Sequence, residues 1–163
     1  MAKVILVCGK ICSGKSTYAK RIQWERRAVV LSCDELMLDL FDDSLGEKHD
    51  EILQRTKVYL YRLAEQIIRT GSNVILDFGF WSRAERQSLK ARLLQKDISC
   101  ELHYVKVSRQ TWQEYLKKRN ENVRKGLEKA YYVDENMKRL FGEQFEEPDS
   151  DEVDVLVEPE EEE

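Results

Sequence analysis

Short apolar runs alternate along the chain with longer segments in which apolar residues recur at every third or fourth position. Short solid runs are typical of strands buried on both faces, and the spaced pattern is typical of helices with one apolar face. The predicted strands span residues 4–8, 28–32, 74–76, 102–107 and, at one edge, 153–157. The predicted helices cover residues 15–27, 52–68, a segment after Ser82, 112–119 and 133–141. This alternation predicts an α/β fold with a parallel sheet covered by helices on both faces.

Two local signals support the predicted helix boundaries. Ser82 and Glu85, three residues apart, form a capping box in which a hydroxyl and a carboxylate satisfy free amides at a helix start. Gly71 follows the helix predicted at 52–68, where a glycine often ends a helix. Ligands bind at the carboxyl ends of the strands in sheets of this type. We therefore expect the chemistry of the protein in the segments that follow the strands.

Length and composition fit one folded domain. The chain has 163 residues, of which 42% are hydrophobic and 36% charged, and it is long enough to bury one substantial core. No apolar run reaches membrane-spanning length, and the N-terminus lacks a signal-peptide pattern. The four cysteines lack the spacing of a zinc site or a disulfide framework; they are Cys8, Cys12, Cys33 and Cys100. We therefore expect a cytoplasmic protein with reduced thiols.

Acidic residues are concentrated at the C-terminus. Residues 149–163 hold nine carboxylates and no lysine or arginine, whereas residues 1–148 hold 27 basic and 22 acidic side chains, a net charge of +5. A mildly basic body would attract phosphorylated ligands. A mixed solvated surface beside an acidic tail explains the same charges. Residues 158–163 are predicted to form a free tail.

The segment Gly9-x-x-x-x-Gly14-Lys15-Ser16 matches the phosphate-binding loop pattern in full and lies between a predicted strand and a predicted helix. Glycines let the backbone curl so that its amides point at phosphate oxygens, the lysine reaches the outer phosphates, and the hydroxyl ligates Mg²⁺. Cys12 fills a small-residue position in this loop. The nucleotide-binding residues that the pattern predicts are Gly9, Lys10, Cys12, Ser13, Gly14, Lys15, Ser16 and Thr17.

Two carboxylates follow the second and third predicted strands. Asp34 could be a general base that takes a proton from an acceptor hydroxyl, or it could cap a helix, for which aspartate is equally suited. Asp77 comes directly after an apolar run, an arrangement that holds Mg²⁺ or its water shell in many nucleotide-binding proteins; a cap or turn residue is the alternative. Trp81, shortly after Asp77, could stack on a substrate ring, but core packing is the favoured interpretation.

Residues 117–126 form a basic stretch at the end of a predicted helix. One interpretation is a lid whose arginines, Arg119 and Arg124, close over nucleotide phosphates. The other is that the positive charges compensate the dipole at the helix C-terminus. The second is preferred for the lysines and the first for the arginines.

Five segments are distributed across nearly the whole chain: GKICSGKST, LSCDEL, VILDFGFWSRAER, YLKKRNENV and FEEPDSDEVDVLV. Together, and in this order, they resemble segments of the small P-loop kinases related to zeta toxins, chloramphenicol phosphotransferase, gluconate kinase and phage-type polynucleotide 5′-hydroxyl kinases. The first segment is specific to P-loop proteins broadly. The third segment and the last are specific to this branch.

The resemblance implies a P-loop NTPase three-layer sandwich, with a five-stranded parallel sheet, helices on both faces and a short helical lid at about 119–130. It implies one kinase-like domain over 1–157, followed by the acidic tail, and it implies ATP and Mg²⁺ as cofactors. The catalytic residues that it implies are Lys15, Asp34, Arg119 and Arg124. The metal would be held by Ser16 and supported by Asp77.

One departure from the family bears on the substrate. Polynucleotide kinases of this type carry an arginine three residues after the base, where this chain has Met37, so a nucleic-acid acceptor is disfavoured. The sequence favours an ATP-dependent phosphotransferase that acts on a hydroxyl of a small molecule. The alternatives are a polynucleotide 5′-hydroxyl kinase and a nucleotide-gated binding module that hydrolyses ATP slowly. The role of Asp34 distinguishes the kinase from the nucleotide-gated binding module, because only transfer to an acceptor hydroxyl needs a base.

Overall fold

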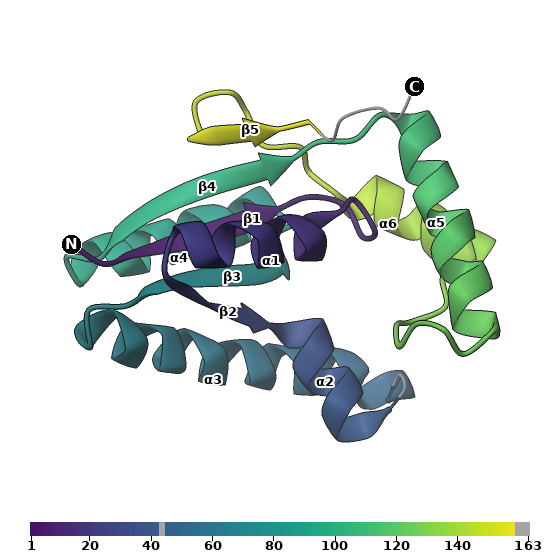
Figure 1. The fold of residues 1–163 in the computed structure, drawn as a ribbon, viewed down its shortest axis with the longest axis horizontal. Helices are drawn as coiled ribbons and strands as arrows, with labels where there is room; N and C mark the ends of the chain where they lie inside the picture. Colours follow the sequence, from purple (N-terminus) through teal and green to yellow (C-terminus); the bar gives the residue numbers. More distant parts are fainter. Residues whose placement is uncertain (43–44, 159–163) are drawn as a thin grey trace.

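The fold is built on a five-stranded sheet with the strand order β2-β3-β1-β4-β5, in which every neighbouring pair is parallel. The computed structural model describes residues 1–42 and 45–158. The predicted tail at 158–163 lies, apart from Glu158, outside these residues. The strands are β1 (Lys3–Cys8), β2 (Ala28–Ser32), β3 (Asn73–Gly79), β4 (Ser99–Val105) and β5 (Val155–Val157). The predicted α/β fold and the edge position of the last strand are confirmed (Figure 1).

The described residues form six α-helices and one short 3-10 helix, η1 (Gly46–Lys48). The helix after β2 was not predicted as a separate element from the apolar spacing. It begins because the Ser32 hydroxyl accepts a hydrogen bond from the Glu35 amide, and because two acidic residues occupy its first turn. The helices are α1 (Lys15–Glu25), α2 (Cys33–Phe41), α3 (His49–Arg69), α4 (Arg83–Gln95), α5 (Arg109–Arg124) and α6 (Glu135–Gln144).

Helices cover both faces of the central strand β1, and this places the strand in the core. On one face Val4 and Leu6 pack with Leu60 of α3 and Leu89 of α4. On the other face Ile5 and Val7 pack against Tyr18, Ala19 and Ile22 of α1. The three layers explain why the β1 sequence reads as a solid apolar run and not as an alternating one.

The remaining helices lie at the carboxyl ends of the strands, where α2 and α5 stand on opposite sides of the loop that follows β1 (Figure 1). A third apolar cluster fixes α5 there, formed by Ile11 of the loop with Trp112, Leu116 and Val133. The indole of Trp112 also donates a 2.7 Å hydrogen bond to the Ile11 carbonyl. The loop is therefore held between the sheet and α5.

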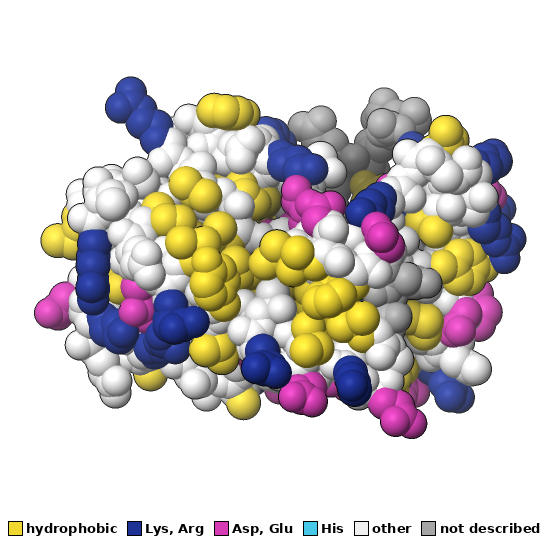
Figure 2. All heavy atoms as spheres, turned by 90° about the horizontal axis from the view of Figure 1, so that it is seen from below, with side chains coloured by type: hydrophobic (Ala, Val, Ile, Leu, Met, Phe, Trp, Pro, Cys, Tyr) yellow, Lys and Arg dark blue, Asp and Glu magenta, His cyan; other side chains and the backbone are white. Residues whose placement is uncertain are grey.

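Hydrophobic side chains also gather on the outside of the molecule, on the side where α2 and α3 lie (Figure 2). The large exposed hydrophobic residues of these two helices are Leu40, Phe41, Val58 and Tyr59. Their exposure places them on the side of each helix that faces away from the sheet. Within the described residues, no helix is both long and apolar enough to cross a membrane.

Candidate nucleotide and acceptor site

The loop between β1 and α1 has the geometry of a phosphate cradle. Gly14 caps α1 with a φ of 90°, a left-handed conformation that glycine adopts without strain. Gly9 lies so close to its surroundings that a β-carbon would come within 2.8 Å of the Val105 carbonyl and 2.7 Å of the Ser13 hydroxyl. The N-terminal amides of α1 lack intrahelical partners, and with the helix dipole they favour an anion at this point. The left-handed backbone at Gly14 and the close contacts at Gly9 therefore both require a residue without a side chain.

Lys15 begins α1 and curls back over the loop, where its Nζ donates a 2.6 Å hydrogen bond to the Lys10 carbonyl. Burial lowers the pKa of this ammonium, and the carboxylates of Asp77 and Asp34 oppose the shift. A phosphate oxygen arriving at the loop would offer the ammonium a charged acceptor in place of a neutral carbonyl. This position fits the predicted role of Lys15 at the outer phosphates.

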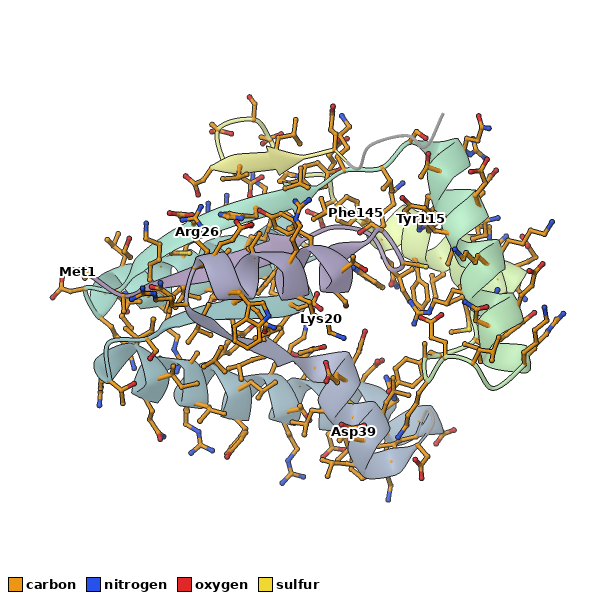
Figure 3. The ribbon with its side chains drawn as sticks, in the orientation of Figure 1. Met1, Lys20, Arg26, Asp39, Tyr115 and Phe145 are labelled. Carbon is orange, nitrogen blue, oxygen red and sulfur yellow. The ribbon has the colours of Figure 1, made fainter. Side chains whose placement is uncertain are left out.

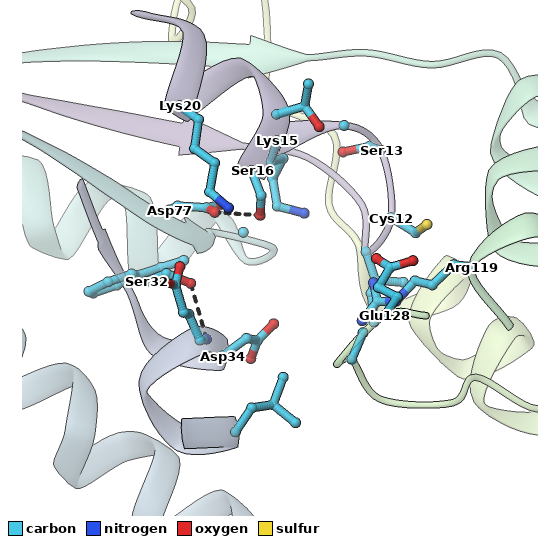
Figure 4. A pocket seen from close by; sticks show the side chains of 18 of the residues that line it. Cys12, Ser13, Lys15, Ser16, Lys20, Ser32, Asp34, Asp77, Arg119 and Glu128 are labelled. Atoms are coloured by element: carbon cyan, nitrogen blue, oxygen red, sulfur yellow. Dashed lines mark hydrogen bonds between the residues drawn. The ribbon is translucent and has the colours of Figure 1, made fainter. Parts of the chain in front are cut away.

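Ser16 and Asp77 meet at the base of the loop, where the Ser16 Oγ donates a 2.7 Å hydrogen bond to the Asp77 carboxylate (Figure 4). The strand β3 runs to Gly79, so Asp77 lies within the strand, opposite Val7, and does not follow it. Asp77 is only 7% exposed, and burial raises its pKa although Lys15 opposes the rise. A hydroxyl and a carboxylate are oxygen ligands of the kind that Mg²⁺ prefers, so these two residues fit the metal.

Asp34 lies in the first turn of α2, and its carboxylate points into the space beneath the loop (Figure 4). The side chain that caps α2 is Ser32, whose Oγ accepts from the Glu35 amide at 3.3 Å. Asp34 is therefore not the N-cap of this helix, which was the structural alternative to its predicted role.

A cavity of about 480 Å³ joins these residues into one site. The loop and α1 form its upper wall in Figure 4, α2 forms its lower wall, and α5 with the segment after it closes the third side. Lys20 of α1 and Asp39 of α2 also line the cavity, from opposite sides of the opening (Figure 3). The predicted residues that it brings together are Cys12, Ser13, Gly14, Lys15, Ser16, Thr17, Asp34, Asp77 and Arg119.

A second cavity of about 380 Å³ lies on the other side of the loop, between α1, α5 and the end of β5. Tyr18, Tyr115 and Val157 give it flat and apolar surfaces. Five residues line both cavities, namely Cys12, Gly14, Thr17, Arg119 and Glu128. The two cavities therefore adjoin each other at the loop and at Arg119.

The two predicted lid arginines differ in their surroundings. Arg119 lines both cavities, and its buried Nε has no hydrogen-bond acceptor among the described residues. Arg124 instead lies over the ring of Tyr132, 4.9 Å from the centroid, and borders neither cavity. The structure therefore places Arg119 at the site and leaves Arg124 one turn farther along α5.

Trp81 packs in the core, which is the favoured interpretation of its sequence position, and it also lines the cavity. Its ring packs against Phe141 with centroids 5.1 Å apart, in the cluster that anchors α5 and α6. Its indole donates a 3.1 Å hydrogen bond to the Gly9 carbonyl, and one side of the residue lines the cavity. The favoured core role is thus observed at a residue that also forms part of the cavity wall.

Six further polar residues of the cavity were not among the predicted site residues, although the last two lie within the predicted lid: Lys20, Ser32, Glu35, Asp39, Glu128 and Lys129. The Nζ of Lys129 lies 3.6 Å from Asp39 and 3.2 Å from Asp42, so the segment after α5 reaches across to α2. No motif marks Lys129, because its partners are far away in the sequence. Glu35 directly follows Asp34, and the pattern of first-turn acids could have drawn attention to it.

The fold and the site define a small P-loop kinase-like protein. A family model described as an AAA domain matches residues 4–148, and the chain belongs to this family. No curated protein matches the chain. The predicted relationship to small P-loop kinases is confirmed at the level of the family and the fold.

Solved structures share the fold at low sequence identity. A candidate kinase from Chloroflexus aurantiacus is 17% identical with a TM-score of 0.74, covering 96% of this chain and 86% of its own. Kti12 from Chaetomium thermophilum, solved with ADP-AlF3, is 16% identical with a TM-score of 0.69 and coverages of 95% and 87%. The APS kinase CysC of Mycobacterium tuberculosis, solved with AMPPNP and APS, is 16% identical with a TM-score of 0.64 and coverages of 99% and 90%.

Proposed function

We propose that this protein transfers the γ-phosphate of ATP to a hydroxyl of a small molecule. The observation that carries the proposal is the single cavity in which the loop and Lys15, the Ser16–Asp77 pair and the Asp34 carboxylate come from three different elements. The loop, a metal pair and a separate carboxylate are the parts that phosphoryl transfer to a hydroxyl requires. The neighbours solved with AMPPNP or ADP-AlF3 support ATP as the nucleotide.

In this proposal the position of each cavity residue determines its role in the transfer. Mg²⁺, when bound, neutralises charge on the phosphates, and the hydroxyl of Ser16 and the carboxylate of Asp77 would hold it. Lys15 and Arg119 place positive charge beside the phosphates from two sides of the cavity. Asp34 takes the acceptor proton while the acceptor oxygen forms its bond to phosphorus and the bond to the ADP oxygen breaks. ADP and a phosphate ester leave, with the proton on Asp34.

Met37 argues against a polynucleotide acceptor. The side chain is 1% exposed and packs inside the protein, so it offers no charge to a nucleic-acid phosphate. A basic contact near the acceptor is what a phosphate backbone requires. The small-molecule acceptor is therefore preferred on structural grounds as well.

Asp34→Asn tests the proposal, with acceptor-stimulated ADP release measured over a panel of hydroxyl compounds and oligonucleotides. Asparagine keeps the size of the side chain but cannot take the proton, so transfer should fall by about 10²–10⁴-fold, while ATP affinity and melting temperature stay near those of the parent. The matched control is Asp50→Asn, at an exposed position in the first turn of α3. Undiminished transfer in Asp34→Asn would contradict the proposal, and so would ATP hydrolysis that no acceptor stimulates.

A further inference from the structure

We infer that the phosphate acceptor carries a positively charged amine close to its hydroxyl, as in an amino alcohol or an amino sugar. This inference rests on the proposed function and names the substrate class for the same site. It is carried by the unequal distribution of charge around the 480 Å³ cavity.

The acceptor wall of the cavity is acidic. We use this term for the lining residues of α2, which face the loop from the other side of the cavity (Figure 4). The helix contributes three carboxylates and the apolar side chain of Leu38. The lining carboxylates of α2 are Asp34, Glu35 and Asp39.

The positive charges of the cavity are on the opposite side or are already paired. Lys20 extends from α1 toward Asp77, and Arg119 extends from α5 (Figure 4). Lys15 also extends from α1, and its Nζ lies at the loop, where it donates to the Lys10 carbonyl. Lys129 forms ion pairs with Asp39 and Asp42. Among the described residues, neither Asp34 nor Glu35 takes part in an ion pair, so both carboxylates are available to a charged acceptor.

A bound nucleotide would neutralise the positive charges that lie at the loop. Four phosphate charges at the loop would be met by Lys15, Arg119, the helix dipole and Mg²⁺. The buried Arg119 Nε, which has no acceptor in the described parts of the chain, is consistent with an anion on that side. Lys20 is the remaining cation, and it points toward Asp77 (Figure 4), so no free cation on the α2 side would be left for a carboxylate or phosphate group on the acceptor.

Charge and surface together select the acceptor class. A carboxylate on the acceptor, placed beside Asp34 and Glu35, would be repelled by these like charges, which disfavours an acidic acceptor. An ammonium group would gain charge-assisted hydrogen bonds to the same carboxylates. Its carbon skeleton would pack against Leu38, and the rings of Phe78 and Trp81 are suitable neighbours for a cation.

The test uses three sets of compounds matched in size and differing in charge, with the full-length protein, ATP and Mg²⁺. The sets are ethanolamine, ethylene glycol and glycolate; glucosamine, glucose and gluconate; and deoxystreptamine, inositol and inositol phosphate. Acceptor-stimulated ADP release should be highest for an amine in at least one set, and at least fivefold above the anionic member. Highest release with an anionic member, or no preference for amines in any set, would overturn the inference.

Glu35→Gln tests the wall itself, and Glu25→Gln is the matched control because Glu25 is exposed and lies outside the cavity. The ratio of kcat/KM for the amine to that for its neutral counterpart should fall about twofold to fivefold in Glu35→Gln, the usual value of a solvent-accessible charge pair. The fall should come from KM. An unchanged ratio in Glu35→Gln, or an equal fall in Glu25→Gln, would contradict the inference.

A separate measurement distinguishes failure of this inference from failure of the proposed function. AMPPNP with Mg²⁺ should raise the melting temperature of the wild type whatever the acceptor is. A shift with AMPPNP, together with turnover of an anionic acceptor, overturns the inference and leaves the kinase proposal intact. Absence of the AMPPNP shift overturns both.

Discussion

The Ser16 hydroxyl donates a 2.7 Å hydrogen bond to the Asp77 carboxylate, joining the first turn of α1 to β3. The two residues are 61 positions apart in sequence. Parallel pairing of β1 with β3 brings them together, since Val7 and Asp77 are partners in the sheet. The pair forms the floor of the cavity, directly below the phosphate loop.

The first prediction concerns Mg²⁺ at this pair. Asp77→Asn keeps an oxygen that can accept from Ser16 but removes the negative charge that would favour the metal. Loss of a supporting carboxylate typically costs 10–100-fold in metal affinity. We expect the Mg²⁺ concentration that half-saturates ATP-dependent thermal stabilisation to rise by that factor.

Thermal shift with ATP, titrated over Mg²⁺, is the measurement for Asp77→Asn. The stability of the ligand-free variant should stay near that of the parent or increase, because burial already raises the pKa of Asp77. An identical Mg²⁺ titration in both proteins would show that Asp77 does not support the metal.

The second prediction concerns Lys15. Lys15→Ala removes the ammonium that lies over the loop and should weaken nucleotide binding strongly. A saturating ligand stabilises by RT ln(1 + [L]/Kd), about 2.7 kcal/mol at one hundred times the Kd, so the ATP-induced rise in melting temperature should largely disappear in the variant. Lys117→Ala on α5 is the comparison, because this exposed lysine lines neither cavity. Equal shifts in Lys15→Ala and the wild type would refute nucleotide binding at the loop.

The sequence predicted the parts of this fold that depend on local pattern. The solid apolar runs of β1 and β3 predicted a sheet covered on both faces. The predicted cap at Ser82 is present, with the Glu85 amide donating to the Ser82 Oγ at 3.1 Å, whereas the Glu85 carboxylate accepts from Lys57. The phosphate loop was predictable because the backbone geometry of one short segment requires its glycines. Such features need no knowledge of the tertiary structure.

The features that were missed depend on contacts between distant segments. Lys129 lies at the cavity because of Asp39 and Asp42, about ninety residues earlier. The difference between Arg119 and Arg124 has the same origin, since a helical stripe cannot show which turn of α5 reaches the loop. Trp112 fixes that position through its hydrogen bond to the Ile11 carbonyl, 101 residues away.

The third prediction concerns the segment 119–130, which was predicted to be a lid. Arg119 lines the cavity, and Lys129 reaches α2 only through exposed ion pairs, which contribute little stability. Without ligand we expect rapid amide exchange in the segment after α5. With AMPPNP and Mg²⁺, exchange over 119–130 should slow by about tenfold or more as phosphate contacts order it.

Hydrogen exchange followed by mass spectrometry is the measurement for the lid. The N-terminal half of α5, held by Trp112 in the apolar cluster, is the internal reference and should change less. Identical exchange over 119–130 with and without AMPPNP would mean that the segment is a static part of the surface.

The fourth prediction concerns a buried arginine away from the cavity. Arg86 of α4 has 0% exposure; its Nη1 donates to the carbonyls of Phe80 and Glu146, and its Nε and Nη2 donate to the carboxylate of Glu152. The guanidinium thus ties the C-terminal segment to the end of β3. Arg86→Leu leaves a buried carboxylate and two carbonyls without their donor, and should lower the free energy of unfolding by about 3–5 kcal/mol. Urea unfolding measures the loss, with exposed Arg69→Leu at the end of α3 as the control.

The last prediction is the pH dependence that follows from the same pair. Burial alone would raise the pKa of Glu152, but the hydrogen bonds from Arg86 and from the Asp149 amide outweigh it and hold this pKa below its usual value of 4.5. The folded state therefore binds the proton less readily than the unfolded state. The resulting stabilisation is complete above the unfolded pKa and is lost as pH falls through the lower, folded pKa.

Two more glutamates contribute in the same direction. Hydrogen bonds from Lys3 and His103 lower the pKa of Glu101 despite burial, and for Glu65 those from Lys96 and Arg92 outweigh burial. Asp77, whose pKa burial raises, opposes them. We expect the free energy of unfolding, measured in urea between about pH 3 and pH 7, to decline below about pH 5. In Glu152→Gln the free energy should be lower at neutral pH and should decline less steeply toward acid. Parallel curves for the two proteins would show that the Arg86–Glu152 pair does not shift the Glu152 pKa on folding.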